Sequence, residues 1–86
     1  MNLQSMEYII AISEEKSLSR AAERLLISQA ALSQHLKKLE IELDAKLFER
    51  QHGRLALTDA GRVYVNGARR VLDIYNKALY QIYHMQ

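Results

Sequence analysis

The 86-residue sequence has no cysteine, no proline and no apolar stretch long enough to cross a membrane. Without cysteine the chain forms neither disulfide bonds nor thiolate metal sites. Its first apolar run contains Glu7 and has no basic segment before it, so we expect neither a secretory signal nor a bilayer span of roughly 20 residues. With 49% hydrophobic and 26% charged residues, the composition indicates one small globular unit, and we expect it to be cytoplasmic.

The features that most enzymes need are also scarce. The sequence has no glycine-rich phosphate loop and no spacing that suggests a Ser-His-Asp arrangement, and a chain of this size leaves little volume for a substrate pocket. His35, His52 and His84 are far apart and form no H-E-x-x-H motif, so we expect them at the surface. We therefore predict no catalytic activity, no metal site and no cofactor.

The most informative stretch that is present runs from Ser28 to Leu43. Its leucines recur at steps of four, three and four, which places them on one face of a helix; they are Leu32, Leu36, Leu39 and Leu43. The opposite face has no carboxylate and carries Ala30, Gln34 and Lys37, with Ser33 and Lys38 near its margins. A helix that buries leucines and exposes amide, hydroxyl and ammonium groups suits insertion into the DNA major groove.

Two shorter helices are expected before this stretch. Asn2 can cap a first helix that ends near Glu15 or Lys16, and Ser17 or Ser19 can cap a second. The expected apolar positions are Leu3, Met6, Ile9, Ile10 and Ile12 in the first helix, and Ala21, Ala22, Leu25 and Leu26 in the second. Ile27 and Ser28 leave only a short connection, with Ser28 as the cap of the third helix, so the arrangement is a helix-turn-helix.

A small hairpin is predicted to follow. Apolar residues flank the polar run 49–54, in which Gly53 can supply the positive φ of a tight turn. We expect strands at 46–50 and 54–57, and the whole hairpin, residues 46–57, would form a basic wing beside the helix 28–43. Arginines of such a wing can reach a phosphate or the minor groove.

The last element is predicted to be one long helix capped by Thr58, with Asp59 in its first turn. Because no proline interrupts it, the helix would extend for roughly 40 Å. Its apolar residues follow a heptad-like spacing: Val65, Ala68, Leu72, Tyr75, Leu79 and Ile82, with Tyr64, Val71 and Ala78 beside them. So long a seam exceeds what a small domain can cover, so we expect a second copy of the chain to cover it. The predicted division is a domain at 1–58 and a dimerisation helix at 59–86.

The net charge of +2 is weak evidence for a nucleic-acid partner, but its distribution is informative. Residues 45–70 contain two acidic groups, Glu49 and Asp59, against six basic ones: Lys46, Arg50, Arg54, Arg62, Arg69 and Arg70. This excess lies just after the candidate recognition helix, where contacts to phosphates would be useful.

Four runs of residues together resemble the N-terminal DNA-binding domain of LysR-type transcriptional regulators, a bacterial family of winged helix-turn-helix proteins. The runs are Ser19-Arg20-Ala21-Ala22-Glu23-Arg24-Leu25, Ser28-Gln29-Ala30-Ala31-Leu32-Ser33-Gln34-His35-Leu36-Lys37-Lys38-Leu39-Glu40, Leu47-Phe48-Glu49-Arg50 and Leu57-Thr58-Asp59-Ala60-Gly61. They cover nearly all of the chain in the family's order. The resemblance implies a mainly α fold, a palindromic double-stranded DNA operator, and an antiparallel homodimer through the linker helix. It also implies a small-molecule-sensing domain and higher oligomers in full-length members, whereas this chain stops before such a domain.

The resemblance also assigns roles to single residues. Gln29, Ala30, Ser33 and Gln34 would face base edges, and phosphates would be held by Ser17, Ser28, Lys37, Lys38 and the wing residues Arg50 and Arg54. Three positions depart from the family pattern: Ala30 replaces a frequent proline, and Gln34 and Gly53 each replace a frequent arginine. Because arginine pairs bidentately with guanine, the departure at Gln34 implies a different base preference.

Each role has a structural alternative. The polar face of the helix 28–43 could be exposed without a partner, Lys37 and Lys38 could simply be solvated or pair with Glu40 and Glu42, and Arg50 could form a structural ion pair. Arg62, Arg69 and Arg70 are expected on the solvent side of the long helix, and Tyr64 and Tyr75 in packing contacts. As a whole, the chain could instead be a helical dimerisation module that binds no specific DNA.

Overall fold

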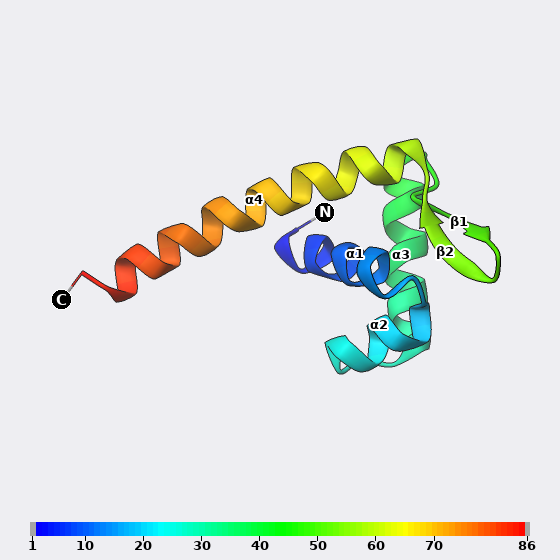
Figure 1. The fold of residues 1–86 in the computed structure, drawn as a ribbon, viewed down its shortest axis with the longest axis horizontal. Helices are drawn as coiled ribbons and strands as arrows, with labels where there is room; N and C mark the ends of the chain where they lie inside the picture. Colours follow the sequence, from blue (N-terminus) through cyan, green and yellow to red (C-terminus); the bar gives the residue numbers. More distant parts are fainter. Residues whose placement is uncertain (1, 86) are drawn as a thin grey trace.

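The computed structural model describes residues 2–85, which form four α-helices and one two-stranded β-hairpin (Figure 1). The elements in order are α1 (Leu3–Glu15), α2 (Leu18–Leu25), α3 (Gln29–Leu43), β1 (Phe48–Gln51), β2 (Arg54–Leu57) and α4 (Asp59–Tyr83). Residues 2–57 gather into a head, from which α4 extends (Figure 1). The predicted winged helix-turn-helix with a long final helix is confirmed. Within the described part of the chain no helix is both long and apolar enough to cross a membrane.

The helices begin at residues whose side chains accept a hydrogen bond from the first free backbone N–H groups. Ser17 rather than Ser19 caps α2, since Ser19 lies inside the helix. The four bonds are Ser5 N to Asn2 Oδ1 at 2.8 Å, Arg20 N to Ser17 Oγ at 3.2 Å, Ala31 N to Ser28 Oγ at 3.0 Å and Gly61 N to Thr58 Oγ1 at 3.0 Å. The predicted helix starts are therefore confirmed.

The core lies where α1, α2, α3, the base of the hairpin and the first turns of α4 meet. Its fully buried large side chains are Ile9, Ile12, Leu32 and Leu47. The leucine face of α3 is confirmed, because Leu32 and Leu39 are buried and Leu36 and Leu43 pack against the core. The core therefore fixes which face of α3 is left for solvent.

The end of α2 corrects the prediction for Leu26. This residue adopts the left-handed conformation (φ 60°), and the Ile27 N–H donates to the Ala22 carbonyl at 3.1 Å, a bond typical of a Schellman turn. The chain reverses here, so Ile27 packs against the core while the Leu26 side chain is 91% exposed. Leu26 is therefore not one of the core positions of α2.

The hairpin, which we call the wing (residues 48–57), is shifted relative to its predicted first strand. β1 spans Phe48–Gln51 rather than 46–50, and Gln51 pairs with Arg54 across the turn. Both turn residues, His52 and Gly53, have positive φ (52° and 76°), as a type I′ turn requires. The sequence identified only Gly53, because glycine is the residue that adopts positive φ most readily.

Hydrogen bonds hold the base of the wing to the rest of the head. The Leu55 N–H donates to the Lys16 carbonyl at 3.1 Å, which ties β2 to the end of α1. The Thr58 hydroxyl, besides capping α4, donates to the Lys46 carbonyl at 2.6 Å. Since an isolated two-stranded hairpin is only marginally stable, these ties set where the wing lies relative to α3.

The first turns of α4 belong to the core, which corrects part of the predicted dimer seam. A Cβ at Gly61 would lie 2.1 Å from the Leu47 carbonyl oxygen, so only glycine fits there. Val65 and Ala68 are 4% and 3% exposed within a single chain. Because the head already covers them, these two residues are not available to a second copy. Beyond Ala68 no residue of α4 in the described range is buried.

Candidate nucleic-acid interface

The polar face of α3 is open to solvent along its length. Gln29, Ala30, Ser33 and Gln34 are all exposed, as are Lys37 and Lys38, about one turn beyond Gln34. Ser28 at the helix start is exposed, and Ser17 at the start of α2 is half-buried. All the residues proposed for contact with bases on α3 are thus brought to one accessible surface.

Contacts on the other face hold α3 in place. The His35 Nε2 and Ser5 Oγ atoms lie 2.7 Å apart, and Tyr8 meets the His35 ring edge-on with a centroid distance of 4.8 Å. His35 is therefore half-buried against α1, and the expectation of a surface histidine is wrong. At the other end of the helix, Glu40 accepts a 2.7 Å hydrogen bond from the Leu47 N–H.

Cations divide into two groups according to whether a carboxylate lies near. Five are within 4 Å of a carboxylate: Arg24, Lys46, Arg62, Arg69 and Lys77. Seven have no such partner among residues 2–85: Lys16, Arg20, Lys37, Lys38, Arg50, Arg54 and Arg70. The alternative of a structural ion pair for Arg50 is thus not observed in the described structure.

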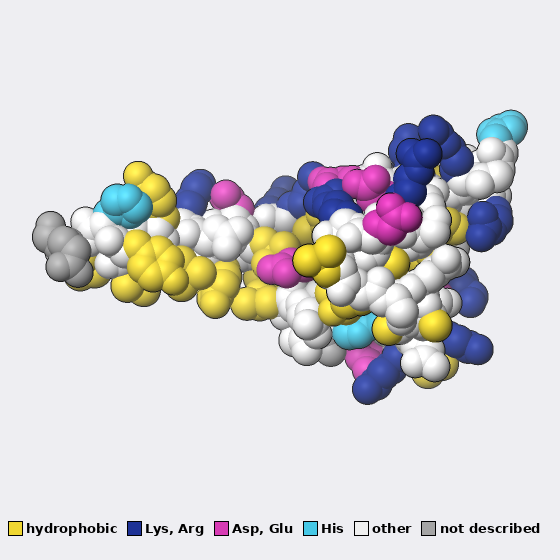
Figure 2. Space-filling model, turned by 90° about the horizontal axis from the view of Figure 1, so that it is seen from below, with side chains coloured by type: hydrophobic (Ala, Val, Ile, Leu, Met, Phe, Trp, Pro, Cys, Tyr) yellow, Lys and Arg dark blue, Asp and Glu magenta, His cyan; other side chains and the backbone are white. Residues whose placement is uncertain are grey.

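Six of the seven unpaired cations lie on α3, on the wing, at the end of α1 or at the start of α2. Figure 2 shows dark blue side chains at the end of the molecule away from the tip of α4. We call the exposed face of α3, the wing and these six cations the reading side. Lys16 and Arg20 were not singled out in the sequence, because nothing local distinguishes an unpaired cation from a paired one.

Two arginines of α4, Arg62 and Arg69, form ion pairs within the chain. Arg62 pairs with Asp59 and donates to the Leu57 carbonyl at 3.2 Å. Arg69 Nη2 lies 3.0 Å from Glu14 Oε2 on α1. All three arginines are exposed, so their predicted place on the solvent side of the helix is confirmed. Arg62 and Arg69 also pair with carboxylates of the chain, whereas Arg70 is unpaired in the part of the chain that the structure describes.

Ile41 is an exposed apolar residue on the last turns of α3. It is 71% exposed and lies in an open hollow of about 450 Å³ beside Gln34, Lys37 and Lys38. The long side chains of the two lysines supply apolar surface along their stems. Ile41 therefore lies on the same helix face as the proposed DNA contacts.

The outer half of α4 presents an uncovered apolar face, which Figure 2 shows as side chains in yellow along the helix. Ile74 is 70% exposed, Tyr75 45% and Ile82 58%, while Leu72 and Leu79 are half-buried. A spacing of three and four residues continues this face to the head through other positions: Tyr64, Gly67, Val71, Ile74, Ala78 and Ile82. The face is rotated from the predicted seam, because Val65 and Ala68 point into the head.

An apolar hollow lies at the base of that face. Its volume is about 310 Å³, and its lining residues come from the end of α3, the following loop and the first turns of α4: Leu43, Ala45, Leu47, Ala60, Val63 and Tyr64. The Tyr64 hydroxyl is buried without a hydrogen-bond partner in the described residues, and burial raises the pKa of this phenol. The phenol is therefore neutral at physiological pH.

Comparison with known proteins identifies the relatives of this architecture. Residues 3–62 match the family model described as "Bacterial regulatory helix-turn-helix protein, lysR family". Two regulators of Bacillus subtilis (strain 168) are similar in sequence: YxjO is 41% identical over 87% of this chain, and CitR is 31% identical over all of it. The chain spans 26% and 30% of the lengths of these two relatives.

Two solved structures are similar in fold and contain DNA. The complex of the BenM DNA-binding domain with benA site 1 DNA has a TM-score of 0.92 and 29% identity, with all of both chains covered. The CbnR DNA-binding domain complex with DNA has a TM-score of 0.85 and 32% identity, covering 94% of this chain and 93% of that one. The similarity therefore extends over α4 as well as the head.

Proposed function

The chain belongs to the LysR family of bacterial regulatory helix-turn-helix proteins, and on that premise we propose that it binds double-stranded DNA sequence-specifically as a homodimer. The observation that carries the proposal is the open polar face of α3, together with unpaired cations on that helix, on the wing, at the end of α1 and at the start of α2. Phosphate neutralisation supplies much of the affinity of such proteins for DNA. We assign the chain no catalytic activity, and its operator would be met in the cytoplasm.

In this proposal the first two turns of α3 read bases in the major groove. Gln29 and Gln34 each carry an amide that can pair bidentately with adenine. Ser33 can bond to a base edge, and the Ala30 methyl group can contact the methyl group of thymine. These residues therefore favour A·T pairs over the guanine that an arginine at position 34 would select.

Phosphates would be held by residues around that helix. Ser28 accepts from the Ala31 N–H, which leaves its own hydroxyl hydrogen for a phosphate oxygen. Ser17 accepts from the Arg20 N–H at α2 in the same way, and its hydroxyl lies 3.1 Å from that of Ser19. The cations that would contact phosphates are Lys37, Lys38, Arg50 and Arg54, with Lys16 and Arg20 added by the structure.

The homodimer would form through the outer half of α4, with the helices antiparallel. The interface proposed here keeps Leu72, Tyr75, Leu79 and Ile82 and adds Val71, Ile74 and Ala78. We also propose that these residues belong to a longer protein with a small-molecule-sensing domain, since the relatives are several times longer than this chain. Higher oligomers would form through that domain.

Selection from a pool of random duplexes tests the function. We expect enrichment of two half-sites in palindromic arrangement, about 34 Å or a multiple of it apart. Affinity for an enriched duplex should fall with salt at a log-log slope of about −0.9 for each phosphate neutralised. Equal binding to scrambled duplexes, or a slope near zero, would contradict the proposal.

A chain that ends at Arg70 tests the dimer separately. It retains Val65 and Ala68, so the head should fold, but it lacks most of the outer apolar face. We expect a monomer in sedimentation, with binding to one half-site retained and the preference for two half-sites lost. A shortened chain that still sediments as a dimer would exclude the outer half of α4 as the interface.

A further inference from the structure

The point at which α4 leaves the head is held by one ionic contact. Arg69 follows directly after Ala68, the last buried residue of α4, and its Nη2 atom lies 3.0 Å from Glu14 Oε2. In the range 2–85 this is the only ion pair that joins α4 to the head. It lies just beyond the last buried residue of α4, so it can resist a change in the angle between α4 and α1.

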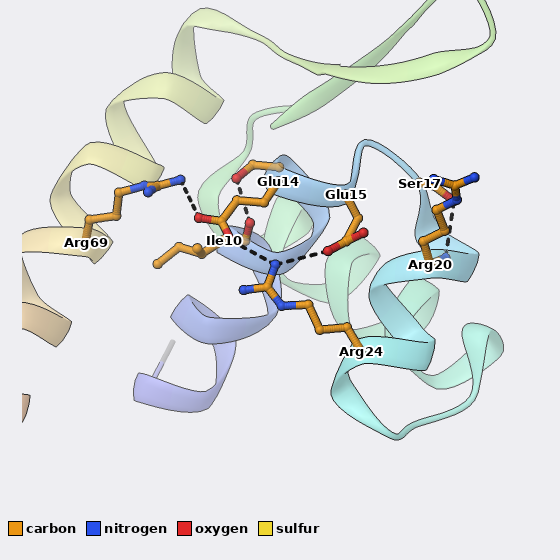
Figure 3. A network of polar contacts seen from close by, with 8 residues as sticks. Ile10, Glu14, Glu15, Ser17, Arg20, Arg24 and Arg69 are labelled. Atoms are coloured by element: carbon orange, nitrogen blue, oxygen red, sulfur yellow. Dashed lines mark hydrogen bonds and ion pairs between the residues drawn. The ribbon is translucent and has the colours of Figure 1, made fainter.

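Glu14 is also tied to the helix-turn-helix. Its second carboxylate oxygen, Oε1, lies 2.8 Å from Arg24 Nη1 on α2, and the same nitrogen is 3.2 Å from Glu15 Oε2 (Figure 3). Hydrogen bonding to Arg24, with further contributions from both arginines, lowers the pKa of Glu14 from its ordinary value. Both of its oxygens are thus engaged, one by α2 and one by α4.

A small change in the direction of α4 would change the distance between the two heads of a dimer on DNA. The helix continues from Ala68 to Tyr83, about 22 Å at 1.5 Å per residue. Tilting such a segment by about 10° moves its end by roughly 4 Å, which is similar to the 3.4 Å rise of one base pair. In a dimer joined by the outer halves of α4, the angle at Arg69 therefore sets the distance between the two heads.

We propose that Glu14 is a positioning residue that fixes the angle between α4 and the helix-turn-helix, and thereby the half-site spacing that the homodimer selects. This inference rests on the proposed function, because it requires a DNA-binding dimer. Glu14 itself touches no DNA in this account. It acts through Arg24 and Arg69, so its removal should change the tolerance to spacing without changing which bases are read.

The test uses the 86-residue chain and duplexes that the unaltered chain enriches from a random pool. One series of duplexes has base pairs inserted or deleted between the half-sites, and another carries a single half-site. For Glu14→Gln we expect the affinity penalty of a one-base-pair change in spacing to shrink about two- to five-fold, the scale of an exposed ion-pair network. Affinity for the single half-site should stay the same.

Two further variants test whether a change in the spacing profile comes from the Glu14–Arg69 contact. Arg69→Gln removes only the contact to α4 and should broaden the spacing profile in the same way. It therefore tests the role of the Glu14–Arg69 contact even if Glu14→Gln folds poorly. Glu15→Gln makes the same chemical change one residue along, keeps the Glu14–Arg69 contact and should leave the profile unchanged. The inference is overturned if Arg69→Gln keeps the original profile, or if Glu15→Gln broadens it equally. Failure of the unaltered chain to enrich any sequence would instead overturn the proposed function.

Discussion

The reading side and the opposite side of the head, where α1 meets α2 and α4, carry similar cations in different surroundings. On that opposite side, which we call the scaffold side, Arg24 and Arg69 both lie against Glu14. On the reading side Lys38 and Arg54 have no carboxylate partner within the described structure. The difference shows that a cation's partners, rather than the net charge of +2, indicate its use: paired cations contribute to the fold, and unpaired ones are available to a ligand.

If substitutions on the two sides changed the same property, paired and unpaired cations would not differ in their use. The largest effect is expected at Gly61, where the first turn of α4 packs against Leu47 and the base of the wing. A methyl group there would overlap the Leu47 carbonyl oxygen, so Gly61→Ala should lower the free energy of unfolding by about 3 kcal/mol or more. Urea denaturation measures this loss. The matched control is Gly67→Ala, where a Cβ meets no atom and stability should rise by up to about 1 kcal/mol; an equal loss in both variants would contradict the packing at Gly61.

On the reading side, Gln34→Ala should change specificity without changing stability. Gln34 is exposed and its side chain bonds to no other described residue, while a bidentate amide–base pair contributes about 1–3 kcal/mol of discrimination. Selection from random duplexes should therefore show relaxed preference at one position in each half-site. An unaltered preference at every position would remove Gln34 from the proposed contacts.

Lys38→Ala should weaken binding to all duplexes alike. The magnitude of the log-log salt slope should fall by about 1, and the free energy of unfolding should stay within about 0.5 kcal/mol because Lys38 has no partner to lose. Lys77→Ala is the control, since Lys77 lies on α4 and pairs with Asp73 at 3.0 Å. If both variants changed the slope equally, the slope would report overall charge rather than a phosphate contact.

The smallest expected effect concerns acid stability on the scaffold side. Because the arginines lower the pKa of folded Glu14, its contribution is present above the pKa of an unfolded glutamate, about 4.3, and is lost as the pH falls through the lower folded value. Glu14 is 37% exposed, so the contribution should be below about 1 kcal/mol. Denaturation between pH 3 and 6 should show that Glu14→Gln loses less stability on acidification than the unaltered chain, and parallel curves would show that the ion pairs contribute nothing.

Local features of the fold could be predicted because they depend on neighbours in the chain. The caps at Asn2, Ser28 and Thr58 and the leucine face of α3 follow from side chains within one or two turns. Errors arose where the chain reverses or where distant parts meet. Leu26 continued the helical pattern but lies in a left-handed turn, and Val65 fitted a dimer seam but packs into the head.

By itself the sequence determined the helices and their caps, the presence of a hairpin and the face of α3 that is left to solvent, since the periodicity of one helix decides which of its sides is apolar. Only the tertiary structure decided which cations are neutralised and which side of α4 remains uncovered. Both depend on residues far apart in the chain, such as Glu14 and Arg69, coming within a few ångströms of one another. The attraction between two charges weakens with the distance between them, and burial requires another element to pack on the residue. The residue spacing within a single element encodes neither.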